Sequence, residues 1–357
     1  MSKVQAISLG LVFFAVIVAG ISLKVTGGWP PSIIRSMEGN IAAVGGKISY
    51  FHQALINEAV MYSLEKEGII AAGPAQGLAM GAGMKGLSGV LPFSKITNYC
   101  GILDASSLTG QADLVKYLNY NVYILEKNTE KRWPIASVTK LMTAVIAVED
   151  LNPEARVKIS EQAATVGGSS IGNFKTGEMF KVSDLVKAML VASSNDAAVA
   201  LAQSMGDKEF IDAMQRKASD LGMFDTTYIE PTGLSFVNQS TISDLAKLAT
   251  YIYENHPEIL AITRQPQVEI LELKSGQSRT LSNVDPFAGS PDFIGGKTGF
   301  TDEARRNLVA LFRTNNEMIL TVVLGSDDSF IETAKLKEFV TTCNPNKYGF
   351  ANWSKST

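Results

Sequence analysis

Apolar and polar positions divide the 357-residue chain into unlike parts, of which the first is almost entirely apolar. Residues 4–23 contain only three polar side chains and have a lysine on each side. About twenty such residues suffice to span a bilayer. We therefore expect a single-pass transmembrane anchor, with a signal peptide cleaved near Val18-Ala19-Gly20 as the alternative. Either interpretation predicts that the bulk of the chain lies on the extracytoplasmic side, and the anchor further predicts location at the cell membrane.

A seam of apolar residues follows the break at Trp29-Pro30-Pro31. Its members alternate steps of three and four, as in a heptad repeat: Ile34, Met37, Ile41, Val44, Ile48, Phe51 and Leu55. We expect residues 30–70 to form a juxtamembrane helix that pairs with itself or with another protein. The alternative is an amphipathic helix that packs on the following domain or lies at the membrane interface.

Residues 71–105 are rich in glycine, alanine and methionine, and six glycines fall between Gly73 and Gly89. Such a composition cannot build a core, so this part is expected to be a flexible linker. A substantial domain follows over residues 106–353.

Within that domain the apolar periodicity changes from strand to helix and back to strand. It predicts a strand at Val122–Leu125, a helix from Ser137 through Val148, helices at Phe180–Ala192 and Ala197–Met205, and strands at Leu308–Phe312 and Met318–Leu324. Between the second and third helices lies a bend. This order indicates an α/β domain with a helical part and an antiparallel sheet.

The composition of the chain mainly excludes classes of partner and cofactor. The chain is 46% hydrophobic and 19% charged with a formal charge of −3, which is typical of a globular protein. The chain has no excess of basic residues, so we do not expect nucleic acid as a partner. His52 and His256 are not clustered with the two cysteines, so we expect no metal site and no cofactor. Cys100 and Cys343 flank the large domain, where they could close a disulfide or remain two unrelated thiols.

Three short motifs carry the candidate chemistry: Ser137-Val-Thr-Lys140, Ser193-Ser-Asn195 and Lys297-Thr-Gly299. A serine hydroxyl needs an adjacent base and a place where the oxyanion can develop. On a helix, a three-residue step brings Ser137 and Lys140 within side-chain reach. Lys140 can accept the serine proton only when neutral, and a second ammonium at Lys297 would disfavour its charged form.

Each motif is weak by itself, since Ser63-Leu-Glu-Lys66 and Lys175-Thr-Gly177 repeat two of them. Ser63 lies outside the large domain, and Lys175 breaks the order, with Gly177 better interpreted as a turn. Taken singly, Ser193 and Asn195 could cap a helix, Lys297 could be a solvated edge-strand charge, and Thr298-Gly299 could be a bend. The ordered set within one domain is instead the signature of penicillin-binding proteins and β-lactamases.

The flanking residues narrow this signature. Five segments resemble the D-alanyl-D-alanine carboxypeptidases, which are low-molecular-mass penicillin-binding proteins and serine D,D-peptidases: Pro134–Ala144, Ser193–Ala197, Lys217–Met223, Pro231–Leu234 and Gly296–Ala304. The resemblance covers about residues 106–353. It implies a three-layer α/β/α fold with a central antiparallel sheet and a helical subdomain. It also implies peptidoglycan stem peptides as substrates and β-lactam antibiotics as covalent inhibitors.

The resemblance further implies a role for each motif residue. Ser137 would be the nucleophile and Lys140 its general base, while Asn195 would hold Lys140 and the substrate backbone. Ser193 and Lys297 would pass a proton to the leaving amine. On the third motif, Thr298 would meet the terminal carboxylate beside Gly299, and the amides of Ser137 and Phe300 would form the oxyanion hole.

Several alternatives stay open. A D,D-endopeptidase that cleaves crosslinks would use the same site. A β-lactamase is disfavoured because no Glu-x-x-x-Asn pattern lies between Asn195 and Lys297; Glu230 is the one carboxylate to consider there, and we expect it to solvate a loop. A non-catalytic wall-binding scaffold is disfavoured by the intact motifs. Arg305 departs from the family pattern, which has glycine at this position.

Overall fold

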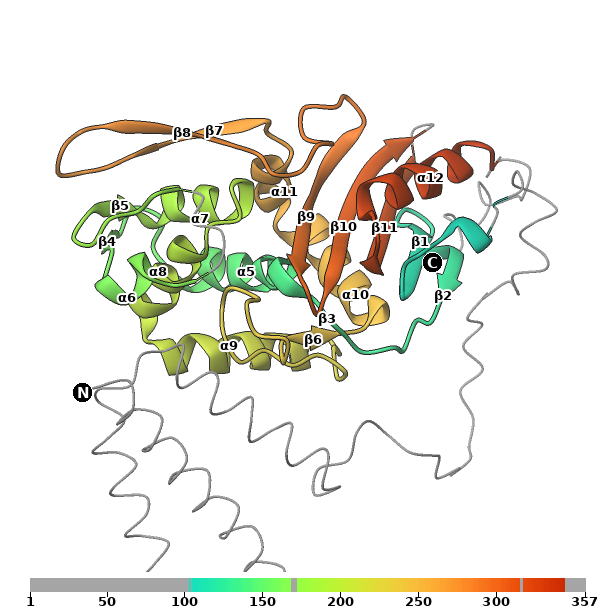
Figure 1. Cartoon of the computed structure of the whole chain (residues 1–357), viewed down its shortest axis with the longest axis horizontal. Helices are drawn as coiled ribbons and strands as arrows, with labels where there is room; N and C mark the ends of the chain where they lie inside the picture. Colours follow the sequence, from blue (N-terminus) through green and yellow to red (C-terminus); the bar gives the residue numbers. More distant parts are fainter. Residues whose placement is uncertain (1–102, 104, 168–171, 315–316, 344–357) are drawn as a thin grey trace, which may run out of the picture. The chain divides into compact units, whose positions relative to one another are not determined.

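The computed structural model describes residues 103, 105–167, 172–314 and 317–343 (Figure 1). The expected anchor, the juxtamembrane helix, Ser63 and Cys100 lie outside these residues. Within the described part of the chain, none of the helices has both the length and the apolar character that crossing a bilayer requires.

The centre of the domain is a five-stranded sheet in the order β2-β1-β11-β10-β9, with every neighbouring pair antiparallel. Its strands are β1 (Ala112–Tyr117), β2 (Val122–Lys127), β9 (Phe293–Thr301), β10 (Arg305–Thr314) and β11 (Glu317–Ser326). Strands β10 and β11 contain the two expected apolar runs, and every residue of these runs is buried. A strand buried on both faces needs apolar residues at consecutive positions.

Helices cover both faces of this sheet (Figure 1). The helical elements are η1 (Ala105–Ser107), η2 (Ala136–Thr139), α5 (Lys140–Asp150), α6 (Glu161–Ala164), α7 (Val182–Val191), α8 (Asn195–Met205), α9 (Asp207–Asp220), α10 (Ile242–Asn255), α11 (Pro257–Thr263) and α12 (Ser329–Thr341). Neighbouring residues of β1 point to opposite faces. Val115 packs in a cluster with Leu336 of α12, whereas Leu114 belongs to the cluster that includes Leu245 of α10. The three layers are therefore α12, the sheet, and the α10–α11 side.

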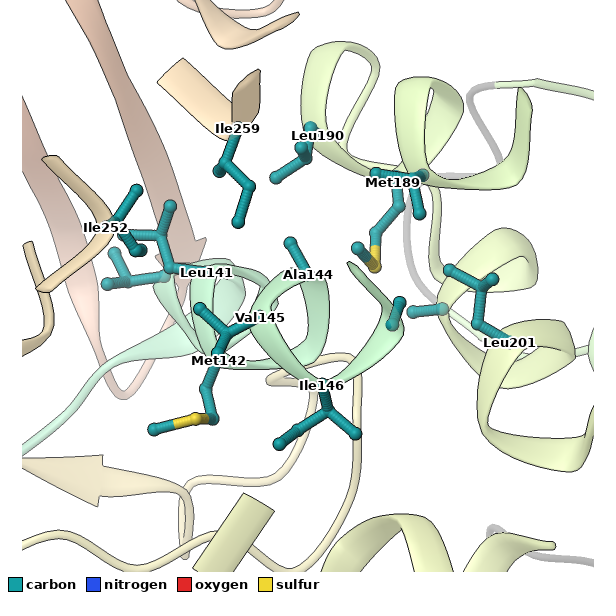
Figure 2. Packing of buried hydrophobic residues seen from close by; sticks show 14 of the residues in the cluster. Leu141, Met142, Ala144, Val145, Ile146, Met189, Leu190, Leu201, Ile252 and Ile259 are labelled. Carbon is teal, nitrogen blue, oxygen red and sulfur yellow. The ribbon is translucent and has the colours of Figure 1, made fainter. Parts of the chain in front are cut away.

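Helix α5 lies at the centre of the helical part, where its apolar side chains point in several directions (Figure 2). All residues from Lys140 to Ala147 are buried. The neighbours in this cluster come from four other helices: Met189, Leu190, Leu201, Ile252 and Ile259. A helix surrounded in this way is held in a fixed position, which matters because the candidate nucleophile lies at its N-terminal end.

Three two-stranded sheets complete the domain. They pair β3 (Trp133–Pro134) with β6 (Gln239–Ser240), β4 (Arg156–Lys158) with β5 (Met179–Lys181), and β7 (Gln267–Leu271) with β8 (Ser278–Ser282). The β7–β8 hairpin runs along α7 (Figure 1). The β3–β6 pair joins the segment before η2 to a loop far along the chain.

The elements differ from the sequence prediction at several places. Strand β1 was not predicted, because the buried polar residues Asp113 and Lys116 interrupt its apolar pattern. The expected helix at Ser137 begins with the 3-10 turn η2, and Phe180 belongs to β5 instead of the next helix. The third motif lies on the nine-residue strand β9 and not in a bend. Glycines 295 and 296 weaken the strand pattern there.

Candidate active site

The candidate nucleophile lies on the turn that precedes α5. Ala136 has a φ of 47°, a left-handed conformation that is unusual for a residue with a side chain. Ser137 follows on η2, and Lys140 is the first residue of α5. The three-residue step places Lys140 Nζ 2.8 Å from Ser137 Oγ. The pair therefore has the contact that proton transfer needs.

Lys140 is fully buried and has two further partners. Its Nζ donates to Asn195 Oδ1 at 2.8 Å and to the Thr232 carbonyl at 2.6 Å. Asn195 Nδ2 donates to the Gly167 carbonyl, which fixes the orientation of that amide. A neutral amine has two N–H groups and one lone pair. The two oxygens accept the two N–H groups, so the lone pair is directed at the Ser137 hydroxyl.

The surroundings of Lys140 favour its neutral form. Burial lowers the pKa of Lys140 well below its ordinary value, and the positive charge of Lys297 lowers it further. The negative charge of Glu230 acts in the opposite direction. Burial penalises an uncompensated ammonium, so it favours the neutral lysine that can accept the serine proton.

The second motif lies in the bend between α7 and α8. Ser194 is the N-cap of α8, since its side chain accepts the amide of Ala197. The capping role considered for Ser193 and Asn195 therefore belongs to the residue between them. Ser193 has a φ of 57°, and its Oγ lies 3.0 Å from Lys297 Nζ. The hydroxyl of Ser193 is thus directed toward Lys297 of the third motif.

Lys297 on β9 is 1% exposed, so its interpretation as a solvated edge charge is wrong. Its Nζ donates to Ser193 Oγ and to the Thr298 carbonyl, each at 3.0 Å. Burial lowers the pKa of Lys297 to about 7, while the negative charge of Asp285 raises it. Near neutral pH this side chain can both give and accept a proton.

Strand β9 approaches the nucleophile turn closely. A Cβ on Gly299 would lie 2.7 Å from the Ile135 carbonyl oxygen and 3.1 Å from the Ser137 nitrogen. Only glycine allows this approach. Thr298 is half-buried beside it, and Phe300 is 59% exposed with the guanidinium of Arg306 over its ring. The segment expected to contact substrate, Thr298–Phe300, which we call the substrate edge, is therefore an extended strand and not a bend.

Loop 230–238 closes the other side of the turn. Glu230 contacts the loop, as expected, but from a buried position, since it is 2% exposed. Its carboxylate accepts the backbone amides of Thr232 and Gly233, both at 2.6 Å. Gly233 has a φ of 84°, and a Cβ there would overlap the Ala136 carbonyl.

The structure thus brings the sequence-predicted residues into one region by three separate contacts. Ser137, Lys140 and Asn195 form one hydrogen-bonded group, and Ser193 and Lys297 form another. Strand β9, which carries the third motif, packs on the turn of Ser137. Of the repeated triplets, Lys175 is exposed and Gly177 lies in a turn as predicted.

Sequence reasoning missed the supporting residues. Thr232 lies within a segment noted for its resemblance but was assigned no role, and Glu230 beside it was expected only to solvate a loop. Asn307 was not noted at all. Its Nδ2 donates to the Pro134 carbonyl and its Oδ1 accepts the Gly325 amide, so it ties two sheet strands to the segment before η2.

Two other sequence observations have structural outcomes. Arg305 has a φ of 55°, which explains why glycine suits this position, and its guanidinium pairs with Asp327. Cys343 is disulfide-bonded, while Cys100 lies outside the described residues, so their pairing stays a prediction. Over the described ranges, no group of three or more histidine, cysteine or acidic residues could hold a metal ion.

Comparison with known proteins agrees with this geometry. The sequence model of the D-alanyl-D-alanine carboxypeptidase family matches residues 107–328. A D-alanyl-D-alanine carboxypeptidase of Bacillus subtilis (DacF) is 31% identical over 211 residues, which are 57% of this chain and 54% of that protein. The match therefore spans about half the length of this relative.

Two further proteins are similar over most of their own length. A D-alanyl-D-alanine endopeptidase of Escherichia coli is 31% identical over 253 residues, which are 66% of this chain and 77% of the relative. A penicillin-binding protein of Listeria monocytogenes, solved in its ampicillin-bound form, has 30% identity and a TM-score of 0.58. That comparison covers 65% of this chain and 98% of the solved one.

Proposed function

The chain belongs to the D-alanyl-D-alanine carboxypeptidase family of serine peptidases, and from this membership we propose that it removes the terminal D-alanine from peptidoglycan stem peptides. The penicillin-binding α/β fold of its described domain is that of this family. One observation carries the proposal for this chain: Lys140 Nζ lies 2.8 Å from Ser137 Oγ, with its other contacts to acceptor oxygens.

The proposed reaction begins with acylation. Neutral Lys140 takes the proton of Ser137 as Oγ forms a bond to the carbonyl carbon of the penultimate D-alanine. The oxyanion develops between the amides of Ser137 and Phe300, and the close approach of Gly299 to the turn of Ser137 supports this arrangement. Losing one such donor typically costs on the order of a hundredfold or more in rate.

Breakage of the peptide bond needs a proton on the leaving amine. Ser193 and Lys297 can supply it, since they are hydrogen-bonded to each other and the pKa of Lys297 is about 7. Thr298 would bind the terminal carboxylate from the strand edge. Water then attacks the acyl carbon, Ser137 recovers its proton, and the shortened peptide leaves.

β-Lactam antibiotics should acylate the same serine. The Listeria relative in its ampicillin-bound form supports this extension. Glu230 does not support a β-lactamase, because its carboxylate already accepts the amides of Thr232 and Gly233 and a side-chain N–H of Asn238. It is therefore not free to activate a deacylating water.

The second candidate is a D,D-endopeptidase that cleaves peptide crosslinks. The Escherichia coli relative carries this name and matches over 77% of its length. Both reactions break a D-alanyl bond through the same acyl-enzyme. They differ only in whether the leaving amine is free D-alanine or a crosslinked side chain.

A fluorescent penicillin tests the nucleophile. We expect covalent labelling of the full chain, loss of the label in Ser137→Ala, and retention in the control Ser219→Ala, an exposed serine on α9. Persistent labelling of Ser137→Ala would reject the assignment. Mass analysis of purified muropeptides then separates the two candidates, because loss of one D-alanine indicates carboxypeptidase activity and crosslink cleavage indicates endopeptidase activity.

We also propose that residues 4–23 attach the enzyme to the cell membrane, with the catalytic domain on the extracytoplasmic side, and that the chain self-associates through residues 30–70. The apolar sequence alone supports this part. The full chain should sediment with membranes after carbonate extraction, whereas a chain lacking residues 1–28 should not. Recovery of the full chain in the soluble fraction would contradict the anchor.

A further inference from the structure

Glu230 has an unusual environment for a buried acid. Its Oε2 accepts two N–H or O–H groups and its Oε1 accepts three, the longest from the Ser235 amide at 3.4 Å. Oε2 accepts the amide and the hydroxyl of Thr232 at 2.6 and 2.5 Å. Oε1 accepts the Gly233 amide at 2.6 Å and Asn238 Nδ2 at 2.9 Å. Within the described ranges no lysine or arginine forms an ion pair with it, so loop donors alone compensate the buried carboxylate.

These contacts decide where the loop directs its own carbonyl groups. The Thr232 carbonyl accepts from Lys140 Nζ at 2.6 Å, and the Pro231 carbonyl accepts from Thr143 Oγ1 at 2.7 Å. Two successive carbonyls therefore face α5. Gly233, next along the loop, lies directly against the Ala136 carbonyl before the nucleophile. The loop thus contacts both the base and the turn that carries the serine.

We propose that Glu230 is a positioning residue for the general base, which holds the Thr232 carbonyl where it directs the lone pair of Lys140 at Ser137. The proposal rests on the acyl-transfer function proposed above. If the Thr232 carbonyl moves away, one N–H of Lys140 loses its acceptor and can turn toward Ser137 Oγ. The lone pair then no longer points at the proton that it must accept.

The charge of Glu230 acts in the same place. The groups that face Lys140 are Lys297 from β9, Glu230 from the loop, and uncharged Asn195 from α8, which is followed by the buried acid Asp196. Glu230 raises the pKa of Lys140 against the effects of burial and of Lys297. Removing its charge lowers that pKa further, so the acid limb of the rate profile moves to lower pH.

The matched control is Glu332, a second buried carboxylate. It is 3% exposed and accepts the Gly110 and Thr109 amides and the Ser326 hydroxyl, which gives it a similar set of loop donors. It lies on α12, across the sheet from the α10–α11 side. Its replacement tests what the loss of a buried loop-binding carboxylate does by itself.

The experiment measures acylation by a fluorescent penicillin between about pH 5 and 10, together with the melting temperature of each full-length variant. We expect Glu230→Gln to slow acylation roughly tenfold or more at neutral pH and to move the acid limb to lower pH. Glu332→Gln should lower the melting temperature and leave the acid limb unchanged. A Glu230→Gln variant with a wild-type rate, or with a slower rate and an unmoved acid limb, would overturn the proposal.

A second variant covers the case in which Glu230→Gln does not fold. Thr232→Val removes one hydroxyl donor to Glu230 and keeps the carboxylate charge, so we expect a smaller rate loss with the acid limb unmoved. A folded Thr232→Val variant with the wild-type acylation rate would then reject the role. If wild-type protein is not labelled at Ser137, the proposed function fails instead, and the two failures are distinguishable.

Discussion

Two buried lysines with different tasks lie within one site. Lys140 has acceptor oxygens around it and a serine hydroxyl in front of its lone pair. Lys297 contacts a second serine and has Asp285 nearby, whose charge raises its pKa while burial lowers it to about 7. The same residue type can therefore serve as base at one position and as proton donor at the other.

The alkaline limb of the rate profile should report Lys297. Acylation is expected to fall as the pH rises through about 7, because Lys297 then loses its proton. Asp285→Asn removes the charge that raises this pKa, so the limb should move to lower pH. Penicillin acylation rates across the pH range check this, and an unmoved limb in the variant would contradict the assignment to Lys297.

At the scale of elements, the β9–β10 hairpin supports the substrate edge. Its turn is tied to the nucleophile side by Trp133, whose Nε1 donates to the Ala304 carbonyl at 2.7 Å. Arg305 begins β10 in the left-handed region, where a side chain costs about 1 to 2 kcal/mol. The ion pair with Asp327 is partly exposed and offsets at most about 1 kcal/mol of that cost.

Two substitutions at Arg305 separate strain from charge. Both Arg305→Ala and Arg305→Gly remove the ion pair, but only glycine relieves the left-handed conformation. We therefore expect the glycine variant to be more stable than the alanine variant by about 1 kcal/mol, measured as the free energy of unfolding in urea. Equal stability of the two variants would show that the turn is unstrained.

At the scale of the whole molecule, α12 and the sheet meet at a pair of buried acids. Asp113 on β1 is fully buried beside Glu332 of α12 and forms an ion pair with Lys127 at 3.0 Å. Burial, followed by the neighbouring Glu332, raises the pKa of Asp113 to about 7. Lys127 lowers it by a smaller amount. The stability of this junction between α12 and the sheet therefore depends on pH.

The direction of that coupling follows from proton binding. In the unfolded chain Asp113 has its ordinary pKa of 3.8, so between this value and about 7 the folded protein binds the additional proton. The stabilisation is complete below the lower value and is lost as the pH rises through about 7. We expect Asp113→Asn to flatten this decline in the free energy of unfolding.

Urea unfolding at pH 5 and pH 8 measures the effect. The control is Asp212→Asn, which removes an exposed ion pair with Lys208 on α9 and should retain the wild-type decline. If Asp113→Asn loses as much stability between the two pH values as the wild type does, another group is responsible for the decline.

Much of the architecture followed from apolar patterns in the sequence. The runs in β10 and β11 and the long helix after the nucleophile were predictable, because consecutive buried positions demand apolar side chains. Strand β1 was hidden by Asp113 and Lys116, which are buried polar residues with their own partners or cation–π contacts. Patterns of hydrophobicity cannot anticipate such compensation.

The sequence by itself determined the candidate chemistry: Ser137 and Lys140 three residues apart, followed in order by Ser193, Asn195 and Lys297. Such reactive groups are recognisable because few residue types can perform the reaction at that spacing. Only the tertiary structure decided how the groups are oriented. Glu230 holds Thr232, and Gly233 and Gly299 let two distant segments close on one turn, since hydrogen-bond geometry and close approach depend on folding and not on neighbours in sequence.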